Sequence, residues 1–109
     1  MNAKRKGYLV ERKIRKLFEK NKYLVIRAGA SLGVADLVCI KDGKLIFVQV
    51  KSTKKEKYYY YGYMKPKLAG FDFYVIVDFG KGNIVITKPK RIITKKEKKL
   101  EEFLINSLR

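Results

Sequence analysis

The sequence predicts an α/β fold in which helices flank a mixed β-sheet. Helical patterns lie near both ends of the chain, and β-rich runs fill the stretch between them. An Asp-Gly pair separates two of these runs, which is a strong local sign of a β-hairpin. With 109 residues and a hydrophobic fraction of 47%, the chain has the size and apolar content of one compact domain. We therefore expect residues 1–109 to fold as a single domain.

The first predicted element is an amphipathic helix over residues 7–20. Val10, Ile14, Leu17 and Phe18 repeat with the 3.6-residue helical period, and lysines and arginines occupy the opposite face. One face of this helix is therefore expected to pack on the sheet.

Three strands are predicted to follow. Residues 23–27 form the first, and a glycine-flanked loop over residues 29–33 leads to the second, over residues 34–41. The third strand covers residues 44–51. The pair Asp42-Gly43 between the last two strands predicts a two-residue type I′ turn.

The second half of the chain begins with a tyrosine-rich segment, residues 58–63. Pro66 and Gly70 make a long helix after it unfavourable. Alternating apolar residues then predict strands over residues 71–79 and 84–88.

A second helix is predicted to begin at Thr94. Thr94 and Glu97 have the spacing of a capping box, in which each residue bonds the backbone of the other. The apolar stripe of this helix consists of Leu100, Phe103, Leu104 and Leu108.

Charge is the strongest compositional signal. Lysine and arginine number 27 against 10 acidic residues, which gives a formal net charge of +17. Such a chain attracts polyanions, and a nucleic acid is the partner that this excess favours. A lysine-rich solubilising surface is the alternative, although it normally brings more glutamate. Phosphate attraction does not by itself distinguish DNA from RNA.

The composition also narrows the chemistry. The chain has no histidine, which excludes His-based zinc sites and His general bases, and its one cysteine, Cys39, lies in an apolar run as a buried thiol. A metal would have to be a hard cation bound through oxygen, which indicates Mg²⁺ or Mn²⁺. No uncharged apolar run is long enough for a membrane helix, so we expect a cytoplasmic protein without a membrane partner.

The hairpin allows a geometric prediction about three polar residues. If the turn is Asp42-Gly43, Asp36 lies across from Gln49, and Lys51 projects from the same face, diagonal to Asp36. A carboxylate and an amide oxygen can bind a hard cation, and a neighbouring lysine can position its water. The alternative is that the three merely mark the solvated end of the hairpin.

These residues resemble a known signature. Val34-Ala35-Asp36 followed by Gln49-Val50-Lys51 is similar to the PD-(D/E)XK nuclease motif. The upstream pattern, from Lys6-Gly7 to Glu11-Arg12 and then residues 23–27 and Ser31, resembles archaeal Holliday-junction resolvases. The resemblance covers about residues 6–53 of the chain.

The resemblance implies a restriction-endonuclease-like fold and a Mg²⁺- or Mn²⁺-dependent DNA endonuclease acting on branched DNA. Asp36 would be the central metal ligand, Gln49 would stand at the second ligand position, and Lys51 would be the motif lysine. Glu11 would be a further metal or water ligand. Ser31 and Arg27 would contact phosphate.

The chain departs from the family pattern at three points. Gln49 replaces an acidic ligand, which removes one negative charge and should weaken metal binding. Ala35 stands where a proline is common. The tyrosine run and Pro66 leave little room for the helix that usually follows the lysine strand.

DNA contacts are further expected from basic residues near the motif and from one tyrosine: Lys6, Arg12, Lys54, Lys55 and Tyr59. For the tyrosine run as a whole, a core or interface role is favoured over base stacking. A second basic patch comprises Lys88, Lys90, Arg91, Lys95, Lys96, Lys98 and Lys99. The apolar stripe of the last helix could also join two copies into a homodimer.

Two other functions compete with a junction endonuclease. One is a DNA-binding module that keeps the nuclease fold but has lost catalysis because of Gln49. The other is a homing or restriction-like endonuclease that recognises sequence rather than branched structure.

Overall fold

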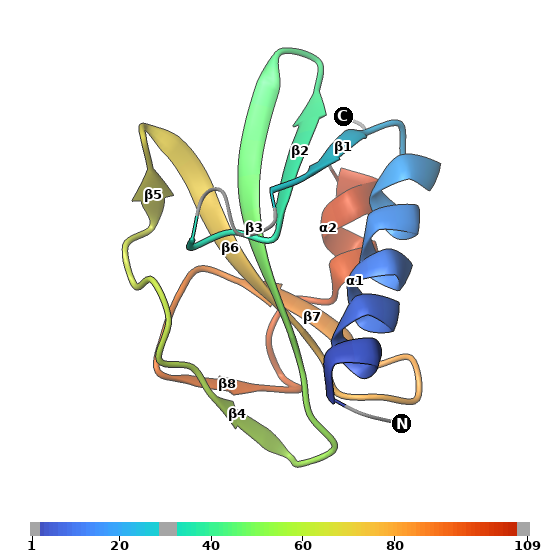
Figure 1. Cartoon of the computed structure of the whole chain (residues 1–109), viewed down its shortest axis with the longest axis vertical. Helices are drawn as coiled ribbons and strands as arrows, with labels where there is room; N and C mark the ends of the chain where they lie inside the picture. The colour runs from blue at the N-terminus through green and yellow to red at the C-terminus, as the bar shows by residue number, and fades with distance from the viewer. Residues whose placement is uncertain (1–2, 29–32, 107–109) are drawn as a thin grey trace.

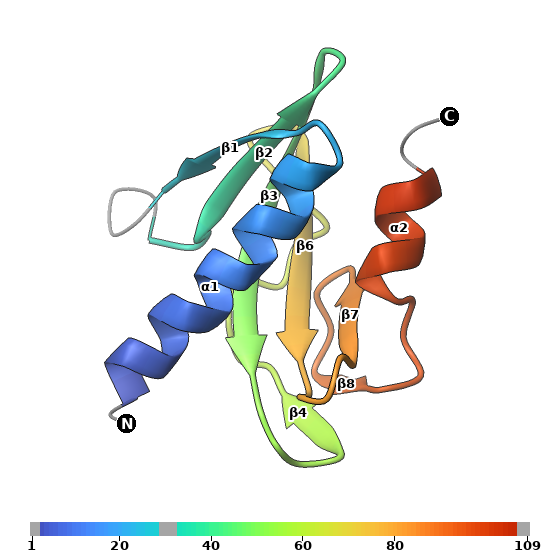
Figure 2. The ribbon, with the colours of Figure 1, turned by 90° about the vertical axis from the view of Figure 1, so that its right-hand side faces the viewer.

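The computed structural model describes residues 3–28 and 33–106, and it shows a mixed β-sheet with two helices on one of its faces (Figures 1 and 2). The elements are α1 (Ala3–Lys20), β1 (Leu24–Arg27), β2 (Leu37–Lys41), β3 (Lys44–Ser52), β4 (Lys57–Tyr59), β5 (Lys67–Leu68), β6 (Phe71–Asp78), β7 (Ile84–Thr87), β8 (Ile92–Thr94) and α2 (Leu100–Asn106).

The main sheet has the strand order β1-β2-β3-β6-β5, and β7 also pairs with β6. β2 and β3 form the predicted antiparallel hairpin, with Lys41 opposite Lys44. Both turn residues have positive φ angles, 50° at Asp42 and 78° at Gly43, as a type I′ turn requires. β3 and β6 are parallel, so the chain must cross over between them.

The helical layer covers one face of this sheet. Ile14 and Phe18 of α1 are fully buried against Leu37 and Val48. The amphipathic prediction is thus confirmed, but α1 begins at Ala3 and not at residue 7, because Gly7 is tolerated inside the helix. No helix in the described ranges is long and apolar enough to cross a membrane.

The prediction for the second helix was wrong at its start. Thr94 is the last residue of β8, and α2 begins only at Leu100. Only one contact of the capping box forms, since the N–H of Thr94 lies 3.5 Å from Glu97 Oε2. Thr94 Oγ1 accepts from the N–H of Lys96 at 3.2 Å, and the N–H of Glu97 donates to the Thr94 carbonyl, also at 3.2 Å. These contacts close a turn, after which residues 98–99 run beside β7. Leu108, predicted to belong to the apolar stripe of this helix, lies outside the described residues.

The crossover from β3 to β6, residues 53–70, contains no helix, as the sequence predicted. It covers the sheet face opposite α1, where Tyr58, Tyr60 and Tyr63 pack with Phe73 and Val75. β4, within this segment, pairs with β8 in a separate two-stranded ribbon, which lies below the main sheet in Figure 1. The core role predicted for the tyrosine run holds for these three residues.

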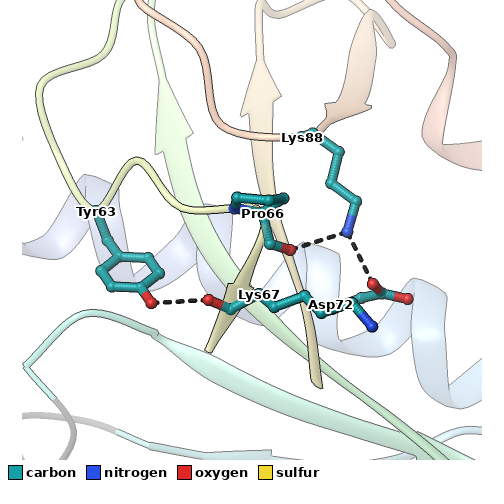
Figure 3. A network of polar contacts seen from close by, with 5 residues as sticks. All are labelled: Tyr63, Pro66, Lys67, Asp72 and Lys88. Atoms are coloured by element: carbon teal, nitrogen blue, oxygen red, sulfur yellow. Dashed lines mark hydrogen bonds and ion pairs between the residues drawn. The ribbon is translucent and has the colours of Figure 1, made fainter. Parts of the chain in front are cut away.

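Polar contacts hold the crossover against β6 (Figure 3). Tyr63 donates through its hydroxyl to the carbonyl of Lys67 at 2.7 Å. Lys88, just after β7, donates to the carbonyl of Pro66 and pairs with Asp72, each at 3.0 Å. A helix is therefore not needed to fix this connection.

Candidate active site

The site lies where β3 extends beyond its partner β2. Their pairing begins at the turn and ends with Leu37 opposite Val48, so β3 continues for four residues past its last partner. Gln49 and Lys51 lie on this extension, whose other edge is paired with β6. The edge left open by β2 is where the carboxylate of Asp36 binds.

Asp36 is held against β3 by two hydrogen bonds. Its backbone N–H donates to the carbonyl of Val48 at 2.8 Å, and its Oδ2 accepts from the N–H of Val50, also at 2.8 Å. The predicted register is confirmed as far as Leu37, but Asp36 itself is not a regular ladder partner of Gln49. Its carboxylate instead accepts a hydrogen bond from the N–H of Val50, because strand β2 begins only after Asp36, which lies in a bend.

The ionisation of Asp36 is affected by its burial and by two neighbouring charged side chains. Burial raises the pKa of its carboxyl group above the ordinary value, and the negative charge of Glu11 raises that pKa further. The hydrogen bond from Val50 and the positive charge of Lys51 act in the opposite direction. Glu11 and Lys51 are thus close enough to Asp36 for their charges to act on its ionisation.

Glu11 is positioned by an ion pair. The Nε of Arg27 donates to Glu11 Oε1 at 2.8 Å, and the carboxylate side chain is 19% exposed. The Arg27 guanidinium also lies over the ring of Tyr8, 5.4 Å from its centroid. This pair links α1 to the end of β1 next to Asp36, since the carbonyl of Asp36 accepts from the N–H of Ala28 at 2.8 Å.

A cleft of about 270 Å³ opens beside the motif lysine. Its lining consists of Gly7 and Val10 from α1, Val50, Lys51 and Ser52 from β3, and Tyr58 from β4. At Gly7 nothing lies within 4 Å of the place where a Cβ would stand, so this position faces open space. Among the described residues, the side chain of Lys51 has no hydrogen bond or ion pair, and its ammonium group is available to a ligand.

The donor set of this site suits a hard cation. Asp36 and Glu11 offer carboxylate oxygens and Gln49 offers an amide oxygen, which are the donors that Mg²⁺ and Mn²⁺ accept. Within residues 3–28 and 33–106, no three acidic, cysteine or histidine side chains come together as a metal-binding group. The family resemblance predicts an acidic residue at position 49, where this chain has Gln49.

The other predicted DNA contacts are distributed differently. Lys6, Lys54, Lys55 and Tyr59 are exposed, on α1, on the turn after β3 and on β4. Arg12 is exposed as well, but it is two residues from the buried Ile14 and so lies on the opposite side of α1, away from the site. Ser31 lies outside the described residues.

One polar contact near the site had no sequence signal. Asp78 is the buried charged residue at the end of β6, and its Oδ2 accepts from Lys13 Nζ of α1 at 2.8 Å. Its Oδ1 accepts from the N–H of Gly80 at 2.8 Å. The two residues are far apart in sequence, and nothing in either segment indicates their pairing.

Comparison with known proteins identifies the family. The family model described as archaeal Holliday junction resolvase (Hjc) matches residues 2–99. The chain belongs to this family. The family resemblance predicted from the motif residues is thereby confirmed.

Two relatives of the resolvase family extend the comparison. A crossover junction endodeoxyribonuclease Hjc from Methanocaldococcus jannaschii is 38% identical over 55 residues, which make up 50% of this chain and 41% of that protein. The chain thus matches less than half of that relative's length. The structure of Hjc, a Holliday junction resolvase from Archaeoglobus fulgidus, superposes with a TM-score of 0.66 at 16% identity and covers 91% of this chain and 95% of that one. The predicted fold class is confirmed, and the resolvase fold accommodates the extended crossover.

Proposed function

We propose that the chain is a divalent-metal-dependent endodeoxyribonuclease that cuts phosphodiester bonds in branched DNA. The observation that carries the proposal is the hydrogen bond from the Val50 N–H to the carboxylate of Asp36, on the strand segment that carries Gln49 and Lys51. Membership of the archaeal Holliday junction resolvase family and a net charge of +17 support branched DNA as the substrate.

The residues divide the chemistry as follows. Asp36, Glu11 and Gln49 would hold the cation, which when bound supplies an activated water and offsets the negative charge on the phosphate. Lys51 attracts the scissile phosphate through an ammonium group that is not committed to any described residue. Asp36 stays fixed because the Val50 amide holds its carboxylate.

Arg27 has two tasks in this arrangement. Its Nε orients Glu11 toward the site, as a positioning contact. The remaining N–H groups of its guanidinium have no partner among the described side chains, and they can donate to a phosphate oxygen. Ser31, whose role follows from the family resemblance, would add a hydroxyl contact to the phosphate.

The test is cleavage of a synthetic four-way junction in Mg²⁺ or Mn²⁺, with a linear duplex of the same sequence as the control. We expect junction cleavage that disappears with Asp36→Ala and falls by at least about 100-fold with Lys51→Met. Junctions of different sequence should be cut at the same distance from the branch point. Absence of cleavage in both metals, or unchanged cleavage by Asp36→Ala, would refute the proposal.

A DNA-binding module without catalysis is the second candidate, and Gln49 is the observation that favours it. Such a module would bind the junction equally well with and without EDTA. It would also cut no junction even after Gln49→Glu restores a third carboxylate. Cleavage gained on that substitution would instead show that the framework is catalytic and that the metal site limits it.

We also propose that the chain acts as a homodimer, because a junction has two strands to cut. The apolar stripe of α2 does not provide the interface, since Leu100 and Leu104 are each 1% exposed in the chain's own core. The part of the sheet face opposite α1 that the crossover leaves exposed does offer one, with Leu24 61% exposed, Ile26 48% exposed and Phe71 45% exposed. Light scattering of wild-type protein and of Ile26→Lys tests this assignment, because the lysine should yield monomers.

A further inference from the structure

The two-stranded ribbon of β4 and β8 has one buried and one exposed face. Tyr58 is paired with Ile93, and both pack into the core beneath the sheet. Tyr59 is paired with Ile92 on the other face, where they are 52% and 45% exposed. Tyr61, just past β4, is 75% exposed. Large apolar side chains this exposed indicate a contact surface. They are not needed for the core, because Tyr58, Tyr60 and Tyr63 already fill it.

A cation is fixed on this surface. The guanidinium carbon of Arg91 lies 4.3 Å from the ring centroid of Tyr61. Its Nη1 donates to the carbonyl of Tyr60, and its own carbonyl accepts from the N–H of Tyr60 at 2.8 Å. Arg91 therefore presents a planar cation and holds an aromatic ring in one place, which lowers the entropic cost of binding a flat ligand. We call Tyr59, Tyr61, Arg91 and Ile92 the ribbon platform.

The charges around the ribbon platform favour a polyanion. Lys57 begins β4 and Lys54 and Lys55 precede it, all exposed. The acidic residues of these segments are already paired: Glu56 with Lys95 at 3.2 Å, and Glu97 with Lys90 at 2.6 Å. Aromatic rings set among unneutralised lysines match single-stranded nucleic acid, whose bases stack on rings while its phosphates meet cations.

The ribbon platform is also next to the candidate active site. Tyr58 lines the cleft of Lys51 from the inner side of β4, and Tyr59 follows it on the outer side of the same strand. The cleft and the ribbon platform thus lie on the two sides of the same short strand. A four-way junction offers bases at its branch point that are easily unstacked, whereas a continuous duplex does not.

We propose that the ribbon platform stacks unpaired bases of branched DNA and thereby favours opened structures over continuous duplex. The substrate class rests on the proposed function, but the stacking itself needs neither metal nor catalysis. Residues 53–70 contain no helix, and this surface is a property of the chain's extended crossover.

The test measures binding in EDTA, by fluorescence anisotropy, to labelled oligo(dT), to a four-way junction and to a linear duplex. The test variant is Tyr59→Leu with Tyr61→Leu, and the matched control is Tyr59→Phe with Tyr61→Phe, which keeps both rings. We expect the leucine variant to lose about 5- to 150-fold in oligo(dT) affinity, as the loss of one or more stacked bases predicts. Its affinity for duplex should change by less than about twofold, and the phenylalanine variant should bind like wild type.

The salt dependence separates stacking from charge. The leucine variant should keep the wild-type slope of log affinity against log salt, because no phosphate contact is removed. Arg91→Met should reduce that slope by about one charge. Unchanged oligo(dT) binding by the leucine variant would overturn the proposal, and so would an equal loss in the phenylalanine variant. A change in solution mass in the leucine variant would show instead that the surface is a protein interface.

These outcomes are independent of the cleavage test. Junction cleavage that fails while oligo(dT) binding depends on Tyr59 and Tyr61 refutes the endonuclease and leaves the platform standing. Cleavage that succeeds with the leucine variant binding oligo(dT) normally refutes the platform alone.

Discussion

Gly62 is the position where a single methyl group should disturb the layer beneath the active site. A Cβ built on Gly62 would stand 2.5 Å from Tyr60 Oη and 2.7 Å from its Cζ. Ordinary contacts begin at 3.4 Å, so the tyrosine ring would have to retreat by almost 1 Å. Tyr60 is 1% exposed and donates to the carbonyl of Tyr63 at 2.8 Å, which leaves the ring little room to move.

The cost of Gly62→Ala follows from these contacts. Overpacking of a buried site costs about 1–3 kcal/mol, and loss of the Tyr60 hydrogen bond adds about 1 kcal/mol. We therefore expect the free energy of unfolding to fall by about 2–4 kcal/mol. The φ of Gly62 is not positive, so steric overlap and not backbone strain is the cause.

The assay is urea unfolding followed by circular dichroism, with Gly7→Ala as the matched control. Gly7 lies within α1 and has nothing within 4 Å of its Cβ position, so alanine should stabilise the protein by about 0.5–1 kcal/mol. The double variant Tyr60→Ala with Gly62→Ala should be no less stable than Tyr60→Ala alone, because the overlapping ring is gone. Stability of Gly62→Ala within about 0.5 kcal/mol of wild type would refute the reasoning.

Three further predictions concern the site and its support. Asp36→Asn should stabilise the metal-free protein at neutral pH, because burial raises the folded-state pKa of Asp36, so its ionised form costs stability above that pKa. This gain in stability should vanish as the pH falls through the folded-state pKa toward 3.8. Urea titrations in EDTA at pH 8 and pH 4 would measure it, and an equal gain at both pH values would contradict burial of the ionised carboxylate as its cause. Gln49→Glu should tighten Mg²⁺ binding by at least about tenfold in calorimetry, because it adds a third carboxylate; unchanged affinity would place Gln49 outside the metal site. Asp78→Ala should cost about 1–3 kcal/mol in urea unfolding, since it leaves the Gly80 N–H and Lys13 without their partner; a neutral result would show that the pair contributes nothing.

The local parts of the fold were predictable because they depend on short-range rules. The period of Val10, Ile14 and Phe18 predicted the buried face of α1, and the Asp-Gly pair predicted both the turn and its register. The register in turn predicted that Asp36 lies beside Gln49 and Lys51. The break in the ladder at Asp36 was not predictable, because it depends on a side chain replacing a backbone partner.

The remaining differences have non-local causes. Thr94 and Glu97 form one of their two predicted contacts, but pairing of Thr94 with Lys57 makes it a strand residue, which no local pattern indicates. β5 and β8 are too short to show alternation in the sequence. Tyr58 and Tyr59 have the same side chain, but Tyr58 packs in the core and Tyr59 is exposed. The pairing of β4 with β8 decides which of them faces the core, and the sequence does not show that pairing.

The extended crossover, residues 53–70, follows the motif residues in sequence and contains none of them. The two parts of the chain therefore differ in how freely their residues can be substituted. The motif residues stand on α1, on β3 and just before β2, whereas residues 53–70 cover the opposite face of the sheet. Substitutions in that layer can change the outer surface without moving Asp36, Gln49 or Lys51, provided that its inward-facing rings still fill the core. The outer surface of the crossover and the motif residues can therefore change independently of one another.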